Sequence, residues 1–201
     1  MQRVALTVDG NGILNAASLA TTGTAAWQGP VGIGGANLVP GSRIAVFAQS
    51  KTVFTALMID RDGILNSASL DTSAGGGWQG PAGIGAGTLV PGSPVAVLAE
   101  SQTVFTALMV DRDGILNSAS LDTSAGGGWQ GPVALGAATL MPGSPVTVIR
   151  RSKTVVSALM VDRDGTLSVA WLDTAAGTGW QGPDGIGTAR LLPGSMITQL
   201  T

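Results

Sequence analysis

The sequence contains no histidine, no cysteine and no tyrosine. These absences remove the commonest general base, the commonest metal ligand and two side-chain nucleophiles, and they exclude disulfides and thiolate metal sites. Charged residues make up only 11% of the chain, and the net charge is -2. The one basic cluster, Arg150, Arg151 and Lys153, is too small for a track of phosphate contacts. We therefore expect no nucleic-acid partner.

Long apolar runs are also missing. No stretch as long as the roughly 18 residues of a membrane-spanning helix runs free of glycine, proline or polar residues. The opening residues, MQRVALTVDG, lack the basic region and apolar run of a signal peptide. We expect a soluble chain without membrane insertion and without a cleaved signal peptide. Release to the extracellular space by another route stays open.

Glycine and apolar residues, in contrast, are abundant. The 201 residues are 44% apolar, which is enough for a real core in a chain of this length. The 31 glycines and ten prolines interrupt the sequence too often for long helices. The composition therefore predicts an all-β fold.

The sequence is a tandem repeat. The segment FTALMVDRDGILNSASLDTSAGGGWQGP, residues 105–132, also stands at residues 54–81 with a single change. The repeated landmarks recur every 51 residues: Trp27, Trp78, Trp129 and Trp180; Pro30, Pro81, Pro132 and Pro183; Pro40, Pro91, Pro142 and Pro193. A period near 50 residues fits one four-stranded blade of a β-propeller. We predict a single domain over residues 1–201, with repeats at approximately 3–53, 54–104, 105–155 and 156–201.

Strands can be placed within one repeat from apolar runs and turn residues. For one blade we expect strands at residues 94–100, 104–110, 115–122 and 129–136, with DRDG as a hairpin turn. Pro132 cannot donate a hydrogen bond inside a sheet, so the fourth strand should be the outer edge. Each blade is then a four-stranded antiparallel sheet, apolar on both faces.

The two ends of the chain match different strands of one blade. Residues 3–12 align with the second strand and the turn after it, whereas residues 193–201 align with a connection and a first, inner strand. We predict that the N- and C-terminal strands pair and close the ring. The alternative is that two chains exchange this strand to form an eight-bladed ring. We expect a homo-oligomer.

The carboxylates of the DRDG turns are weak candidates for chemistry. The pairs Asp60–Asp62, Asp111–Asp113 and Asp162–Asp164 could act as acid and base or hold calcium. However, a catalytic site is rarely repeated three times, and the loop lacks the ligand spacing of an EF-hand. We expect no catalysis, no metal and no cofactor.

The repeated WQGP motif is the stronger candidate. An indole that seals the gap between blades explains it structurally, and a partly exposed indole with nearby polar groups would also suit a sugar. The expected carbohydrate-binding residues come from this corner of each repeat: Trp27, Gln28, Trp78, Gln79, Trp129, Gln130, Trp180, Gln181, Trp171, Asp71, Asp122 and Asp173.

At these motifs the sequence resembles the PLL-like bacterial lectins. The resemblance is carried by MVDRDGILNSASL, by WQGP and by LVPGSPVAV, and it spans nearly the whole chain. It implies a propeller that binds fucose or related sugars between blades, although that family has seven blades. Ser69 and Ser120 stand where the family often has an aromatic residue, as the fourth copy does with Trp171.

The sequence thus favours a multivalent lectin for fucosylated or related glycans. The strongest rival is a repeat scaffold or protein-interaction propeller, natural or designed, without a sugar site.

Overall fold

The computed structural model describes residues 3–19, 26–35, 37–188 and 190–198. They form strands and turns, and the one helical element is a single 3-10 turn, η1 (Thr123–Ala125). None of the described residues belongs to a helix with the length and apolar character needed to cross a membrane. The prediction of an all-β fold is confirmed.

The strands form four separate antiparallel sheets. Sheet 1 holds β1 (Arg3–Val8), β2 (Leu14–Leu19) and β3 (Trp27–Ile33). Sheet 2 holds β4 (Ala45–Ala48), β5 (Val53–Ile59), β6 (Leu65–Asp71) and β7 (Gln79–Ile84). Sheet 3 holds β8 (Ala96–Ala99), β9 (Val104–Val110), β10 (Leu116–Asp122) and β11 (Gln130–Leu135). Sheet 4 holds β12 (Thr147–Arg150), β13 (Val155–Val161), β14 (Leu167–Asp173) and β15 (Gln181–Ile186).

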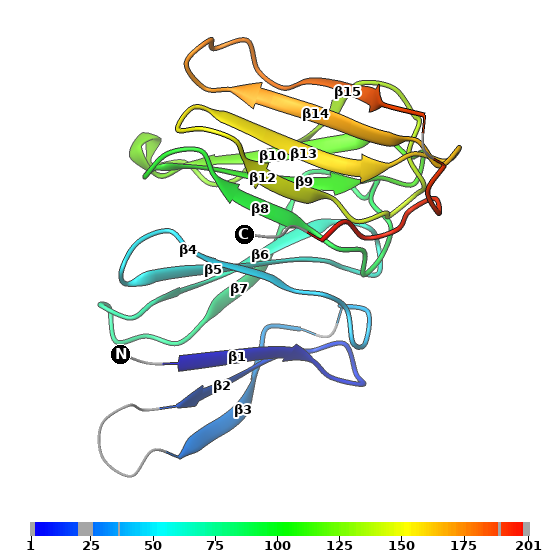
Figure 1. The fold of residues 1–201 in the computed structure, drawn as a ribbon. Coiled ribbons are helices and arrows are strands. Elements are labelled where there is room, and N and C mark those ends of the chain that lie inside the picture. The colour runs from blue at the N-terminus through cyan, green and yellow to red at the C-terminus, as the bar shows by residue number, and fades with distance from the viewer. Residues whose placement is uncertain (1–2, 20–25, 36, 189, 199–201) are drawn as a thin grey trace.

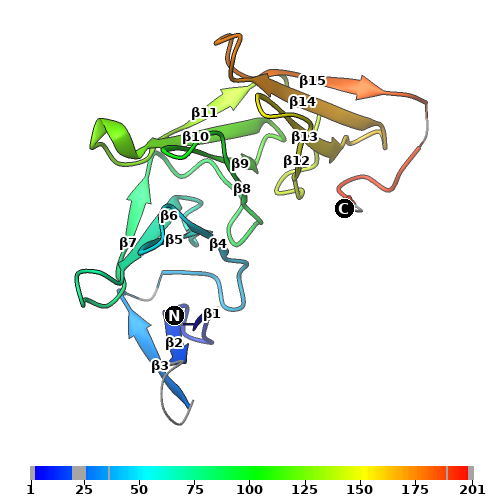
Figure 2. The same ribbon diagram turned by 60° about the vertical axis from the view of Figure 1, so that its left-hand side comes forward.

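The sheets are arranged as the blades of an open arc. Figure 2 shows β3, β7, β11 and β15 along the outer rim, and β4, β8 and β12 on the concave side. Sheets 1 and 4 lie at opposite ends of the arc in both views (Figure 1, Figure 2). Strand β11 is an edge strand, as expected from Pro132.

Sheet 1 differs from the expectation of four strands per blade. It has three strands, because none of the described residues pairs with the free edge of β1. Pairing of the two terminal strands is absent from the described part of the chain, and residues 199–201 lie outside it. Ring closure therefore stays a prediction.

Adjacent sheets pack face to face and build three cores. We call the side of a sheet that looks toward the next repeat its forward face, and the opposite side its backward face. Between sheets 1 and 2, Val8, Leu14 and Ile33 of the forward face meet Ala56, Met58 and Ala68 of the backward face. The same pattern recurs between sheets 2 and 3 and between sheets 3 and 4. Strands in the middle of the arc are buried on both faces for this reason, as in β9.

The DRDG turns lock neighbouring repeats together at one end of the sheets. Leu140 N donates to Gly114 O at 3.0 Å, and Arg163 Nε donates to Leu140 O at 2.7 Å. Gly114 has φ +81°, and a Cβ there would lie 2.0 Å from Leu140 O. The turn therefore needs glycine both for its backbone angle and for the close approach of the next connection.

The chain leaves sheet 4 in the same way as it leaves the other sheets. Gly92 packs on Val39 and Ser42, and Gly194 packs on the equivalent residues Met141 and Ser144. Thr147 Oγ1 donates to Ile197 O at 2.7 Å. Residues 194–197 thus follow the path of a connection toward a further inner strand.

Candidate functional site

The WQGP motif forms a bulge on the outer strand of each sheet. In sheet 3, Ser120 pairs with Gln130 and Ser118 pairs with Val133, so the register shifts by one residue between them. The same shift occurs in the other three sheets. Within the motif, the tryptophan and the glutamine turn to opposite faces of the sheet.

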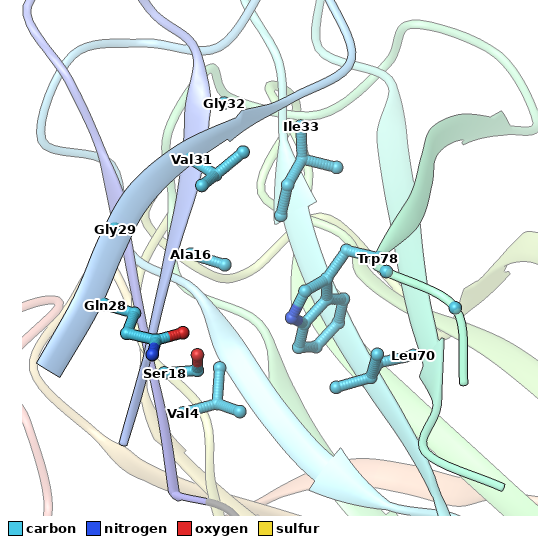
Figure 3. Close-up of a pocket in the computed structure, with 12 residues that line it drawn as sticks. Val4, Ala16, Ser18, Gln28, Gly29, Val31, Gly32, Ile33, Leu70 and Trp78 are labelled. Atoms are coloured by element: carbon cyan, nitrogen blue, oxygen red, sulfur yellow. The ribbon is translucent and has the colours of Figure 1, made fainter. Parts of the chain in front are cut away.

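One consequence is that a tryptophan meets the glutamine of the preceding repeat. A pocket of about 360 Å³ between sheets 1 and 2 is lined by Gln28 from sheet 1 and by Trp78 from sheet 2. Figure 3 shows the indole of Trp78 and the side chain of Leu70 facing Val4, Ser18 and Gln28 across this space. Gly76 and Gly77 of the glycine loop complete the rim beside Trp78. We call this space the inter-sheet pocket.

The tryptophans have a structural role as well. Trp78, Trp129 and Trp180 are half-buried, and each packs against the core that its sheet shares with the preceding one. The ring of Trp129 stands edge-on to Phe47 at 6.0 Å between centroids. The gap-sealing role expected from the sequence is therefore real, and the exposed part of the indole remains open to a ligand in the inter-sheet pocket.

Trp27 is the exception, because no described sheet lies on the backward face of sheet 1. Its exposed fraction is 55%. The predicted site at Trp27 is therefore incomplete in this structure, because the indole faces no neighbouring sheet among the described residues.

The glutamines of the second, third and fourth WQGP motifs hold the glycine loops. Gln130 Nε2 donates to Gly128 O at 3.3 Å, and Gln181 Nε2 donates to Thr178 O at 3.1 Å. Gln79 makes the equivalent contact to Gly77 O at 3.4 Å. Their carbonyl oxygens are left as acceptors, so each amide keeps polar capacity for a ligand.

The aspartates before the glycine loop shape the loop. Asp71 Oδ1 accepts from Ser73 N at 2.8 Å and from Ser73 Oγ at 2.6 Å, and Asp122 makes the same two bonds to Ser124. Asp173 Oδ1 accepts from Ala175 N at 3.0 Å. The bonds from the Ser73 and Ser124 side chains, followed by those from their backbones, lower the pKa of Asp71 and Asp122. Asp71 does not line the inter-sheet pocket, and the predicted sugar contacts of all three aspartates stay predictions.

Trp171 lies on the forward face of sheet 4, where Ser18 lies in sheet 1. It is 37% exposed and borders an open hollow with Arg151, Ser152 and Val155. The structure therefore separates Trp171 from Trp180, which points to the backward face and into the core shared with sheet 3.

In the DRDG turn of sheet 3, hydrogen bonds within the hairpin hold the first aspartate. Asp111 Oδ1 accepts from Asp113 N and Ile115 N, both at 2.9 Å, and Oδ2 accepts from Asn117 Nδ2 at 2.9 Å. Asp111 is buried, whereas Asp113 is exposed. Within the described ranges, no three acidic side chains gather where they could hold a metal ion. These bonds give the DRDG repeat a structural explanation.

Sequence reasoning missed one half of the pocket. Val4, Ala16, Ser18 and Val31 line it from sheet 1, and none of them stands out in the sequence. The signal was available in principle, because alternate residues of a strand face opposite sides and the repeats stack in order.

Comparison with models of protein families and with the sequences of curated proteins gave no match. Solved structures do match. The lectin BP39L from Burkholderia pseudomallei is 29% identical, with a TM-score of 0.79 over 92% of this chain and 52% of that one. AofleA from Arthrobotrys oligospora is 13% identical, with a TM-score of 0.64 over 94% of this chain and 54% of that one.

The fungal lectin of Aleuria aurantia is a further match, described as a six-bladed β-propeller with a novel mode of fucose recognition. It is 16% identical, with a TM-score of 0.60 over 90% of this chain and 54% of that one. The chain thus spans about half the length of the lectins it matches. The resemblance to propeller lectins is confirmed, and these neighbours are lectins rather than enzymes.

Proposed function

We propose that this protein is a multivalent carbohydrate-binding lectin without catalytic activity, and that it binds fucose or a related sugar in the inter-sheet pocket and at the equivalent WQGP corners of the other sheets. The observation that carries the proposal is the pairing of an indole with an amide and a hydroxyl across one pocket. Trp78 faces Gln28 and Ser18 there.

The chemistry of this pocket suits a sugar. A pyranose ring has a face of C–H groups, which packs on a flat indole, and a rim of hydroxyls, which need donors and acceptors. Gln28 and Ser18 supply both. The volume of about 360 Å³ lies at the small end of the range for ligand sites, which fits one or two sugar rings.

The matched lectins support fucose as the sugar bound by this chain. The Aleuria aurantia lectin is described as having a fucose recognition mode, and the wider set of matches includes the lectin SapL1 in complex with α-methyl fucoside. We assign the same specificity to this chain by analogy with these proteins.

Several similar sites per chain would act together. Each shallow site should bind with a Kd of about tens of micromolar to millimolar, since few atoms are buried. Presenting them together raises avidity by roughly a hundredfold or more if their spacing allows simultaneous engagement. Agglutination of glycan-coated particles is the expected result.

The test is titration calorimetry with α-methyl fucoside. Gln28→Ala removes the amide from the inter-sheet pocket and leaves the indole packing intact, so the parent should bind about one more sugar per chain than this variant. Gln102→Ala is the matched control, because Gln102 is an exposed glutamine in the turn before β9. It should bind like the parent.

A glycan array decides the wider question. Binding to fucosylated glycans supports the proposal, and binding to other glycans alone keeps the lectin and overturns fucose. No binding to any sugar by array or calorimetry would leave the repeat scaffold as the better account.

A further inference from the structure

The two ends of the arc expose apolar positions that the inner repeats bury. On the forward face of sheet 4, Leu191 is 38% exposed, whereas the equivalent residues Leu38, Leu89 and Leu140 are at most 1% exposed. Ile186 is 43% exposed, whereas Ile33 and Ile84 are 7% exposed. The forward face of sheet 4 is therefore built like the faces that carry another sheet, but none of the described residues covers it.

The backward face of sheet 1 shows the complementary pattern. Ala5 and Thr7 are exposed, although the residues at the same positions of sheets 2, 3 and 4 are completely buried. Those buried residues are Ala56, Ala107 and Ala158, and Met58, Met109 and Met160. Trp27 is exposed as well, whereas the other three tryptophans of the motif pack on a neighbouring sheet.

A cavity marks the place of a missing inner strand. It has about 250 Å³ and lies beside β1, where Val4, Leu6, Phe54 and Trp78 border it. At the next interface, Phe47 of the inner strand β4 occupies the equivalent place and packs 5.1 Å from Phe105.

We propose that a second copy of this chain covers both ends, so that two arcs join head to tail into a closed ring. In this ring, the forward face of sheet 4 of each copy packs on the backward face of sheet 1 of the other. At each of the two junctions the sheets pack in the same way as neighbouring sheets do at the three interfaces within one chain.

A second copy fits better than closure within one chain. Sheets 1 and 4 stand at opposite ends of the arc (Figure 1, Figure 2). One chain superposes on about half of the lectins it matches, 52% of BP39L and 54% of the six-bladed Aleuria aurantia propeller, so a second copy would supply the length that one chain lacks. Two identical junctions related by a two-fold axis then leave no end open.

Each junction also completes a pocket that neither chain holds alone. At the position of Ser18 the forward face of sheet 4 carries Trp171, and at the position of Val31 it carries Asp184. Trp27 of the partner subunit takes the place of Trp78. The junction pocket therefore has two indoles from two chains, with the Asp184 carboxylate and the Gln181 amide beside them.

This composition differs from that of the pockets inside one chain. Two indoles can hold a pyranose from both sides, and a carboxylate can accept from two neighbouring hydroxyls. We infer that the junction pockets bind the same class of sugar more tightly than the internal ones. This last step depends on the proposed function, whereas the joining of two copies does not.

The joining is tested by the mass of the full chain in solution, from light scattering over a wide range of concentration. The parent should have about twice the 19.9 kDa of one chain. Ile186→Asp and Trp27→Ala should each give the mass of one chain while keeping a cooperative melting transition, because both side chains are exposed in a single copy.

Val133→Asp is the matched control. Val133 is an exposed residue on the outer strand of sheet 3, and the fourth repeat has Asp184 at the same position. This variant should keep the doubled mass. A parent with the mass of one chain would overturn the proposal, and so would a doubled mass that survives Ile186→Asp and Trp27→Ala. A molecular mass that keeps increasing as the protein is concentrated would indicate open filaments and would contradict the closed ring.

The composite pocket has its own test. Trp171→Ser introduces the residue of the other three repeats, so it should keep the doubled mass and remove the tighter class of sites in calorimetry with α-methyl fucoside. If the parent is a dimer that binds no sugar, the proposed function fails and the joining stands. If sugar binding is the same in Trp171→Ser and parent, the junction pocket is refuted.

Discussion

Asp122 influences the candidate site indirectly, because its hydrogen bonds shape the glycine loop before Trp129. Asp122 is exposed, and its lowered pKa comes mainly from the hydroxyl of Ser124 and then from the Ser124 backbone. Because these bonds favour the charged carboxylate, they are present above the ordinary pKa of aspartate and are lost as the pH falls through the lowered value. The glycine loop before Trp129 should therefore loosen only in acid.

Ser124→Ala tests this coupling. Removing the hydroxyl should raise the pKa of Asp122 toward its ordinary value of 3.8. Asp71 serves as an internal control, since Ser73 gives it the same bonds in the preceding repeat, and its pKa should not change. Carboxyl chemical shifts followed by NMR during an acid titration measure both. An unchanged midpoint for Asp122 would show that the hydroxyl bond does not persist in solution.

The hairpin of β9 and β10 is the element whose structure the sequence predicts best. The expected strands at 104–110 and 115–122 are β9 (Val104–Val110) and β10 (Leu116–Asp122), with the DRDG turn between them. The DRDG turn uses the first aspartate of the motif as a hydrogen-bond acceptor, whereas the second aspartate is exposed to solvent. This asymmetry distinguishes a structural turn from a cation site, which would use both carboxylates.

The prediction for this element is a difference between two aspartates. Asp111→Ala leaves two backbone N–H groups without an acceptor and removes one of the two acceptors of Asn117 Nδ2, so it should lower the free energy of unfolding by about 2–4 kcal/mol. Asp113→Ala is the matched control and should cost less than about 0.5 kcal/mol. Urea unfolding measures both. Equal losses, or a melting temperature that rises on adding calcium, would favour a cation site instead.

Local patterns predicted the strands well and the site only in part. Pro132, the apolar run at Val104–Val110 and the Asp-Gly turn each determine a local conformation, and the structure follows them. The pocket depends on which residues face each other between two sheets. The sequence places Trp78 beside Gln79, but the alternation of a strand sends them to opposite faces, and the stacking of sheets brings Trp78 to Gln28.

The whole molecule is a stack of equal interfaces, so its stability depends on whether every face is covered. Repeat arrays gain most of their stability from contacts between neighbouring repeats, and uncovered ends cost apolar burial. In the described part of the chain, the cavity beside β1 and the exposed Trp27 and Leu191 are such costs. An inner strand paired with the free edge of β1 would remove the first of these costs.

The last prediction concerns that strand. Leu200 aligns with Phe47, Leu98 and Ile149, which are partly or fully buried, whereas Thr201 aligns with Ala48, Ala99 and Arg150, which are exposed. If the terminal strand closes the ring as the sequence predicts, Leu200→Asp places a charge among apolar side chains and should lower the free energy of unfolding by about 2 kcal/mol or more. Thr201→Asp adds the same charge one residue away and should change it by less than about 0.5 kcal/mol. Thermal unfolding of both variants beside the parent measures the difference, and equal stability of the two would refute closure of the ring by the terminal strand.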